Sequence, residues 1–302
     1  MTPRFLILGG SSFIGRRLQA ILGAENTLAT YNSTPVEGGV HFDASYHQLA
    51  DQVLKAHKGF THAFLFLGVT NLDFCARNPM ESARINVDAI QNIIVQLRNE
   101  GITPIFASSD AVFDGTHGGW TENDAVCPTL TYGHQKAAVE SFILAHASPG
   151  IVVRLPKVLS TTPGVQGVLD GWLNDLEGGV EIRCAQDQIF SPIEVDEAVR
   201  AMITLVNAEA SGVFHFAAPQ AVSRLELLEM LARAVERRHP IRAKISPCSI
   251  RDFAFAEPRP LNTSMSAAKV EAVLGWHFSD LQHLCAQAAM RRYPASVPRM
   301  TA

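Results

Sequence analysis

The sequence predicts an α/β protein with a doubly wound parallel sheet and a smaller, discontinuous carboxy-terminal region. Three features carry this prediction. Short apolar runs alternate with stretches of helical periodicity through the first half of the chain, a glycine-rich turn follows the first run, and a tyrosine and a lysine four positions apart follow a later one. With 302 residues, of which 47% are hydrophobic, the chain can bury a sizeable core.

Apolar runs of strand length mark the predicted sheet. They cover residues 5–8, 27–30, 62–67, 104–107 and 151–155. Between them, apolar residues recur at helical spacing in residues 14–22, 46–57, 81–99 and 131–146. Because parallel strands are joined by right-handed crossovers, this alternation predicts a sheet with helices on both faces.

The pattern changes after Arg154, where prolines and glycines interrupt the chain up to Asp187. A helix at residues 192–206 and a strand at residues 212–216 are expected to return to the main sheet. Further helices are expected at residues 224–238, 266–274 and 280–291. We therefore predict a first domain of residues 1–155, with returning elements at 192–217, and a second region of residues 156–191 and 218–302.

Composition excludes several classes of function. The net charge of -4 and the scattered basic residues predict no nucleic-acid partner. No apolar run is long enough for a membrane span or a signal-peptide core, so we expect a cytoplasmic protein with no membrane partner. The five cysteines are widely spaced without a Cys-x-x-Cys pair, which predicts free thiols. The eleven histidines show no ligand spacing, so no metal is assigned.

The first apolar run leads into the turn Gly9-x-x-Ser12-x-x-Gly15, and a helix follows. In this context glycines let the backbone approach a pyrophosphate at a helix amino terminus, although a tight turn without ligand is the alternative. The turn identifies the first domain as a dinucleotide-binding Rossmann fold. The residues expected to contact the cofactor here are Gly9, Ser11, Ser12, Phe13, Ile14 and Gly15.

The choice of cofactor depends on the residues after the second strand, which are Tyr31, Asn32 and Ser33. A carboxylate at this place would favour the cofactor without a 2′-phosphate. Because the acid is missing and Arg16 could reach a 2′-phosphate, NADP(H) is preferred and NAD(H) is possible. Asp43 could bond the adenine amino group or cap a helix beginning near residue 46, and both interpretations stay open.

Tyr132 and Lys136 form the predicted proton-transfer pair. Residues four apart share one helix face, so the ammonium can lie near the phenol and favour its ionised form. An unperturbed phenol has a pKa of about 10, and a lower value would make it a better proton relay near neutrality. Ser109, at the end of a predicted strand, is the candidate hydroxyl partner.

The segment 106–115, read together with Tyr132-x-x-x-Lys136, resembles the extended short-chain dehydrogenase/reductase family. Its nearest branch is similar to the dTDP-4-dehydrorhamnose reductases and related sugar-nucleotide-binding proteins. Three further stretches carry the same resemblance, so that it covers nearly the whole chain: residues 70–87, 187–192 and 259–264.

The resemblance implies roles for individual residues. Tyr132 would give a proton to a carbonyl oxygen while a nicotinamide delivers hydride, Lys136 would hold the nicotinamide ribose, and Ser109 would hydrogen-bond the same oxygen. Asn86 would be a structural or proton-relay residue. Three residues after the fourth strand would face the cofactor: Leu67, Gly68 and Val69. The substrate would be contacted by Thr70, Asp110, Ala111 and Lys157.

Two of these positions depart from the branch. Ala111 stands where such reductases usually carry a tyrosine, and Lys157 stands where they tend to carry an aromatic residue. Lys157 could pair with an anionic group of the substrate or lie on a solvated loop. Trp172, in the variable middle of the chain, is a candidate for substrate contact.

We therefore expect a reductase that uses NAD(P)H to reduce a keto group of a nucleotide-activated deoxysugar. A nucleotide-sugar epimerase or dehydratase is one alternative. Another is a non-catalytic NADP-binding regulatory subunit, since one relative of this branch is a partner of methionine adenosyltransferase. The expected partner is a small-molecule substrate, and a homodimer is left open.

Overall fold

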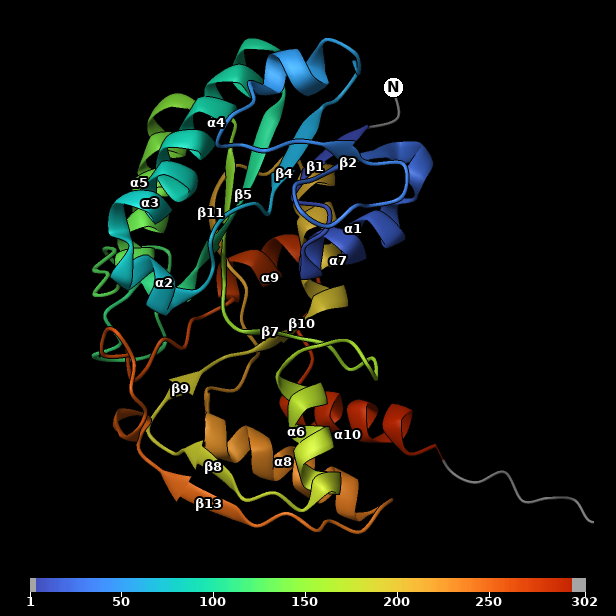
Figure 1. Ribbon diagram of the computed structural model, residues 1–302, viewed down its shortest axis with the longest axis vertical. Helices are drawn as coiled ribbons and strands as arrows, with labels where there is room; N and C mark the ends of the chain where they lie inside the picture. Colours follow the sequence, from blue (N-terminus) through green and yellow to red (C-terminus); the bar gives the residue numbers. More distant parts are fainter. Residues whose placement is uncertain (1–3, 295–302) are drawn as a thin grey trace, which may run out of the picture.

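A computed structural model describes residues 4–294 of the chain. Its centre is a seven-stranded sheet in the order β11-β6-β5-β4-β1-β2-β3, in which every neighbouring pair is parallel (Figure 1). The strands are β1 (Phe5–Leu8), β2 (Thr27–Tyr31), β3 (Val40–His41), β4 (His62–Leu65), β5 (Thr103–Ser109), β6 (Ile151–Leu155) and β11 (Gly212–His215). This order confirms the doubly wound α/β fold.

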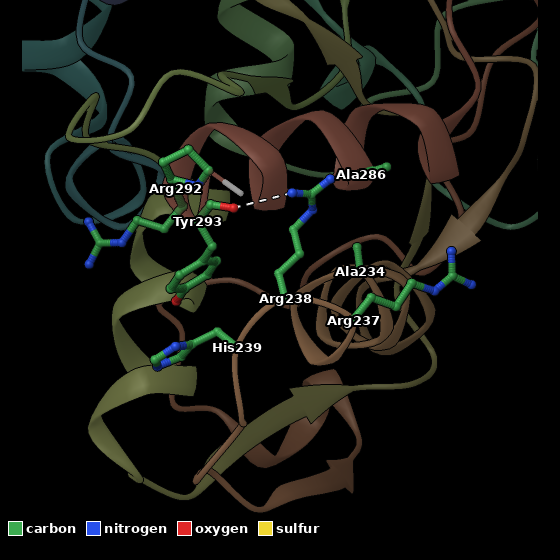
Figure 2. Close-up of a pocket in the computed structure, with 8 residues that line it drawn as sticks. Ala234, Arg237, Arg238, His239, Ala286, Arg292 and Tyr293 are labelled. Atoms are coloured by element: carbon green, nitrogen blue, oxygen red, sulfur yellow. Dashed lines mark hydrogen bonds between the residues drawn. The ribbon is translucent and has the colours of Figure 1, made fainter. Parts of the chain in front are cut away.

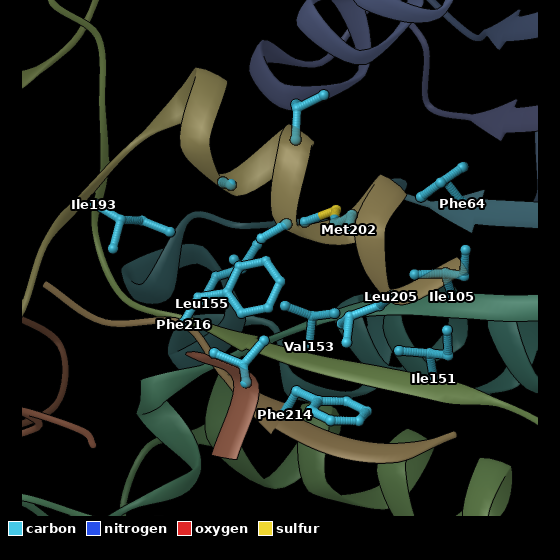
Figure 3. Close-up of a cluster of buried hydrophobic side chains, with 14 of the residues drawn as sticks. Phe64, Ile105, Ile151, Val153, Leu155, Ile193, Met202, Leu205, Phe214 and Phe216 are labelled. Carbon is cyan, nitrogen blue, oxygen red and sulfur yellow. The ribbon is translucent and has the colours of Figure 1, made fainter. Parts of the chain in front are cut away.

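Helices cover both faces of this sheet (Figure 1). One face carries α3 (Pro79–Ala83), α4 (Ile90–Asn99) and α5 (Thr131–His146), and the other carries α1 (Phe13–Leu22) and α7 (Val195–Asn207). Figure 3 shows part of the core under α7, where Met202 and Leu205 pack on Ile105, Val153 and Phe214 of the sheet. Strands buried from both sides read as continuous apolar runs, which is why they could be found in the sequence.

A second apolar core lies below the sheet in Figure 1. It is built from α6 (Val168–Gly178), α8 (Arg224–Glu236) and α10 (Leu281–Arg292). The strands β8 (Ile182–Ala185) and β13 (Ile245–Cys248) pair beside these helices. Two short ladders lie between this core and the sheet: β7 (Val158–Leu159) with β10 (Ile193–Glu194), and β9 (Ile189–Phe190) with β12 (Val222–Ser223). Helix α9 (Ala268–Leu274) packs on α7 beside the sheet.

Two predicted helices differ in the structure. The helix expected at residues 46–57 is reduced to a π-helical segment, Ala50–Leu54, because the carbonyl of Asp43 first captures the amides of Tyr46 and His47 in a turn. The helix expected at residues 81–99 is continuous in space but contains the π-helical segment Arg84–Ala89 between α3 and α4. π-Helical turns of this kind often occur at functional sites.

Two further expectations can be compared with the described residues. All five cysteines are free, as predicted, and four of them are buried. Among residues 4–294, no helix combines the length and the apolar character that crossing a membrane requires.

Candidate active site

The turn after β1 brings three backbone segments into close contact. Gly9 has a φ of +88°, and a β-carbon there would lie 2.8 Å from the carbonyl carbon of Phe66. A β-carbon on Gly15 would lie 2.4 Å from the carbonyl oxygen of Gly9. Ser12 caps α1, because its Oγ accepts a hydrogen bond of 3.1 Å from the Gly15 amide. The turn therefore presents a helix amino terminus without side chains in the way, the arrangement that binds a phosphate.

A cavity of about 310 Å³ lies over this turn, at the carboxyl ends of β1, β2 and β4. In a sheet with this strand order, ligands bind at the edge where β1 and β4 diverge. The cavity collects nine of the residues expected to bind the cofactor: Gly9, Ser11, Ser12, Tyr31, Asn32, Asp43, Leu67, Gly68 and Val69. It is also lined by residues that the sequence analysis missed, among them Phe42, Ala44 and Ser45 beside Asp43.

The remaining predicted cofactor residues lie around this cavity. Ile14 and Gly15 belong to the first turn of α1, and Ser33 is an exposed loop residue; none of the three lines the cavity. Phe13 lines a neighbouring cavity of about 580 Å³, which shares Ser11 with the first. Arg16 also lines this second cavity and not the one that contains Tyr31 and Asn32. The position of Arg16 therefore does not favour the expected contact between Arg16 and a cofactor 2′-phosphate beside Asn32.

Asp43 shapes the loop that closes the first cavity. Its Oδ1 accepts a hydrogen bond of 2.8 Å from the Ser45 amide, and its own amide donates to Nδ1 of His47 over 3.0 Å. The carboxylate therefore stabilises a turn, and the helical segment that follows Asp43 begins only at Ala50. Helix capping, one of the two expected roles, is thus replaced by a turn, while Asp43 still lines the cavity.

The loop after β4 is held by Asn86. Its Oδ1 accepts a hydrogen bond of 2.7 Å from the Val69 amide, and its Nδ2 donates to the Val69 carbonyl over 2.9 Å. The same Nδ2 donates to Oε1 of Gln135 over 2.7 Å, which connects the loop to α5. Gly68, with a φ of +137°, makes the close approach to Asn86 possible. This geometry gives Asn86 a structural role at the cavity wall.

Tyr132 and Lys136 lie buried in α5, with the Lys136 ammonium 5.5 Å from the centre of the Tyr132 ring. The ammonium donates a hydrogen bond of 2.7 Å to the Ala107 carbonyl of β5. Burial lowers the pKa of Lys136 to about 8. Burial, with Asp110 and Cys75 adding to it, raises the pKa of Tyr132. The expected lowering of the Tyr132 pKa is therefore wrong for this structure, because desolvation of the phenolate outweighs the nearby ammonium.

Ser109 ends β5 beside this pair. Ala107, two residues earlier, contacts Lys136, and Ala111, two residues later, packs in one cluster with Tyr132. The Ser109 Oγ accepts a hydrogen bond of 3.1 Å from the Ala111 amide and donates one of 2.9 Å to Oδ1 of Asp110. The three predicted catalytic residues thus share one corner of the fold, between β5 and α5.

A family comparison agrees with this geometry. A model of the RmlD substrate binding domain matches residues 3–292, which is nearly the whole chain. The chain belongs to this family. The resemblance to the extended short-chain dehydrogenase/reductase family, an oxidoreductase family, is thereby confirmed.

Individual relatives of this RmlD-family chain are distant. It is 25% identical to a probable low-salt glycan biosynthesis reductase of Haloferax volcanii, over 68% of this chain and 69% of that protein. It is 23% identical to a dTDP-4-dehydrorhamnose reductase of Sinorhizobium fredii, over 68% and 72%. A methionine adenosyltransferase 2 subunit beta of Danio rerio is 24% identical over 66% of this chain and 62% of its own length.

Solved structures share the fold of this RmlD-family chain. A dTDP-4-dehydrorhamnose reductase of Bacillus anthracis, in complex with NADP, matches with a TM-score of 0.83 at 19% identity, over 94% of this chain and 98% of that one. MoeE5, in complex with UDP-glucuronic acid and NAD, matches with a TM-score of 0.79 at 22% identity, over 96% of this chain and 99% of that one. At these identities the matches show the fold alone.

The RmlD-family chain places the cation of Arg224 where it acts on Lys157, one of the predicted substrate residues. Lys157 follows β6 and is exposed, yet partial desolvation, with repulsion from Arg224, lowers its pKa. Arg224 begins α8, half-buried, and its guanidinium carbon lies 5.9 Å from the ring of Trp172. Within residues 4–294 no carboxylate pairs with Arg224, and the sequence analysis missed this residue. Thr70, another predicted substrate residue, is exposed just before α2 (Leu72–Arg77).

A buried ionic network lies next to Lys136 in α5 and is built on Glu140 and Arg154. Glu140, one turn further along α5, accepts hydrogen bonds from Arg154 of β6, the shortest of 2.7 Å, and one from Ser108. Arg154 also lies 3.0 Å from Nε2 of His215, and burial together with Arg154 lowers the pKa of that histidine to about 4. The four-residue spacing of Tyr132, Lys136 and Glu140 was the signal that could have revealed this network.

A cavity larger than the one over the glycine turn lies elsewhere. It measures about 840 Å³ between α8 and α10 (Figure 2). Figure 2 shows Arg237, Arg238 and His239 around it, with Arg238 donating a hydrogen bond of 3.3 Å to the Tyr293 carbonyl. None of the predicted site residues lines this cavity. The predicted cofactor residues of this RmlD-family chain therefore gather at the smaller cavity over the glycine turn.

Proposed function

We propose that the protein is an NADP(H)-dependent reductase of a keto group on a nucleotide-activated deoxysugar. One observation carries the proposal: Tyr132 and Lys136 are buried together in α5, against the strand that ends in Ser109. This corner lies next to the loop of Gly68 and Val69, which lines the cavity over the glycine turn. Family membership and the reductase names of the curated relatives support it.

The residues around the cavity fit a nicotinamide dinucleotide, which would supply hydride when bound. The helix terminus at Ser12 would hold the pyrophosphate, and Lys136 would hold the nicotinamide ribose. Tyr132 would donate its proton to the carbonyl oxygen that becomes an alcohol. Its raised pKa leaves the phenol protonated at neutral pH, so the proton is present for transfer, although the same shift makes the phenol a weaker acid. Ser109 would hydrogen-bond the same oxygen.

We propose NADP(H) rather than NAD(H) as the cofactor. Tyr31 and Asn32 line the cavity after β2, where a carboxylate would repel a 2′-phosphate. The structure of the Bacillus anthracis protein contains NADP, whereas that of MoeE5 contains NAD. The proposal therefore depends on the residues of this chain more than on its neighbours.

We further propose that Lys157 and Arg224 bind an anionic group of the substrate. A half-buried guanidinium without a carboxylate partner is costly unless a ligand neutralises it. Phosphate groups and carboxylates match the fork of an arginine. A nucleotide-activated sugar supplies such a group in its diphosphate.

The proposal is tested with Tyr132→Phe, which removes only the hydroxyl. We expect NADPH oxidation on a panel of nucleotide-linked 4-keto sugars to fall by about 10²-fold or more. NADPH affinity, measured by fluorescence titration, should stay within about twofold. Tyr46→Phe is the matched control, because Tyr46 is 82% exposed. Retained turnover in Tyr132→Phe would contradict the assignment.

The same panel separates the alternative functions. An epimerase or dehydratase would keep its cofactor bound during purification and consume no added NADPH. A regulatory subunit would bind NADPH and co-elute with a partner enzyme. It would not oxidise NADPH with any ketone of the panel. Activity on simple ketones and aldehydes alone would preserve a reductase but exclude the nucleotide-sugar substrate.

A further inference from the structure

The carboxylate of Asp110 is hydrogen-bonded on both of its oxygens. Oδ1 accepts a hydrogen bond of 2.9 Å from the Ser109 hydroxyl, and Oδ2 accepts one of 2.7 Å from the Thr263 hydroxyl. These two donors are 154 positions apart in sequence. These bonds hold the carboxylate in place but leave each oxygen able to accept another hydrogen bond, so the substrate contact expected for Asp110 stays a prediction.

Thr263 is itself firmly placed. Its amide donates a hydrogen bond of 3.0 Å to the Ile189 carbonyl of β9, and the amide of Asn262 donates one of 3.1 Å to the Gly115 carbonyl. The Ser264 hydroxyl accepts a hydrogen bond of 3.1 Å from the Gly119 amide. The segment 259–264 is thus anchored both to the ladder below the sheet and to the loop that follows β5. The position of the Thr263 hydroxyl therefore depends on the position of the whole segment 259–264.

The hydrogen bonds of Ser109 limit what its hydroxyl can do. A serine hydroxyl has one proton, and Ser109 gives it to Asp110 while its oxygen accepts the Ala111 amide. The direction of the O–H bond is therefore set by Oδ1 of Asp110. To hydrogen-bond a substrate carbonyl, Ser109 must turn this proton from Asp110 to the substrate, starting from the position in which Asp110 holds its side chain. The direction of the Asp110 carboxylate is in turn determined by Thr263.

We propose that Asp110 is a positioning residue that holds the Ser109 side chain in place until the substrate accepts its proton and, through Thr263, couples this placement to the position of the segment 259–264. This inference rests on the proposed reductase function. It assigns Asp110 and Thr263 to the reaction through Ser109, without contact to the reacting atoms. Correct docking of the carboxy-terminal region then becomes a condition for turnover as well as for substrate binding.

The test compares Thr263→Val with Thr263→Ser. Valine keeps the shape and removes the hydroxyl, so we expect kcat to fall about tenfold, while KM and NADPH affinity change by less than about twofold. Serine restores the hydroxyl, and kcat should return to within about threefold of the wild type. Thr116→Val is the matched control, because its hydroxyl bonds Asp114 over 2.8 Å in an exposed loop.

Two results would overturn the proposal. One is a Thr263→Val kcat equal to that of Thr116→Val; the other is a Thr263→Ser kcat as low as that of Thr263→Val, which would indicate packing instead of hydrogen bonding.

A double-mutant cycle in thermal unfolding, with Ser109→Ala and Thr263→Val, tests the coupling without a measurement of activity. We expect the fall in Tm of the double variant to be smaller than the sum of the single falls, and strict additivity would also overturn it. A wild type inactive on every ketone, combined with a non-additive cycle, would overturn the reductase function alone.

Discussion

Asn86 and Val69 exchange two hydrogen bonds, and this exchange shapes the wall of the candidate cofactor cavity. The Val69 amide donates to Oδ1 over 2.7 Å, and Nδ2 donates to the Val69 carbonyl over 2.9 Å. A side-chain amide can pair with a backbone in this way because it carries both a donor and an acceptor. The pair connects the π-helical segment between α3 and α4 to the loop after β4.

The first prediction concerns this pair. Asn86→Asp keeps the acceptor for the Val69 amide but places a carboxylate oxygen against the Val69 carbonyl and Gln135. We expect the free energy of unfolding to fall by about 3 kcal/mol, because buried groups lose their partners. NADPH should bind more weakly in a fluorescence titration. Asn99→Asp, at the exposed end of α4, is the control, and equal NADPH binding by the two variants would contradict the prediction.

The second prediction concerns the contact between α5 and the loop after β5. A β-carbon on Gly133 would lie 2.1 Å from the Ala111 carbonyl oxygen. Gly133→Ala should therefore lower the melting temperature and the turnover together, because the helix of Tyr132 must move. Gly171→Ala in α6 is the matched control, since nothing lies within 4 Å of its β-carbon position. That substitution should stabilise the protein by up to about 1 kcal/mol.

The third prediction concerns the buried ion pair behind Lys136. Glu140 and Arg154 are at most 5% exposed and lie 2.7 Å apart. Glu140→Gln leaves Arg154 without a counter-charge, so urea unfolding should report a loss of about 3–5 kcal/mol. Asp51→Asn breaks an exposed pair with Lys55 and should cost at most about 0.5 kcal/mol. Similar losses in the two variants would show that the buried pair has no special role.

The fourth prediction concerns the charge of Lys136. Burial lowers its pKa to about 8, below the value of about 10.4 that it takes in the unfolded chain. Between these values the unfolded chain binds more protons, so the stability of the wild type relative to Lys136→Met should rise with pH. Unfolding curves from pH 7.5 to 9.5 measure this difference. Lys55→Met, which changes an exposed side chain, should show no such trend.

The fifth prediction concerns the cofactor. Asn32→Asp places a carboxylate in the cavity after β2, where it would repel a 2′-phosphate. We expect the NADPH dissociation constant to rise about tenfold, while that of NADH changes little or falls. Asn123→Asp, in an exposed loop, controls for the added charge. If both cofactors weaken equally, Asn32 is no determinant of cofactor choice.

Local patterns in the sequence carried much of the fold. The strands β1 and β6 could be located to the residue, because a strand buried on both faces is a continuous apolar run. The glycine turn was visible because Gly9 and Gly15 stand where a β-carbon would collide with backbone. Tyr132 and Lys136 could be paired because helical spacing alone places them on one face.

The remaining features depend on contacts between distant segments. Thr263 bonds Asp110 across 153 positions of sequence, and Arg224 lowers the pKa of Lys157 although the two residues lie on separate elements. The pKa of Tyr132 also differs from expectation, because it depends on how much water the whole fold removes from the phenol. The sequence by itself determined the fold class, the glycine turn and the placement of Tyr132 and Lys136 on one helix face, since these follow from local periodicity and spacing. Only the tertiary structure decided how the three predicted catalytic residues are oriented and what electrostatic environment they have, since desolvation and long-range hydrogen bonds arise from packing.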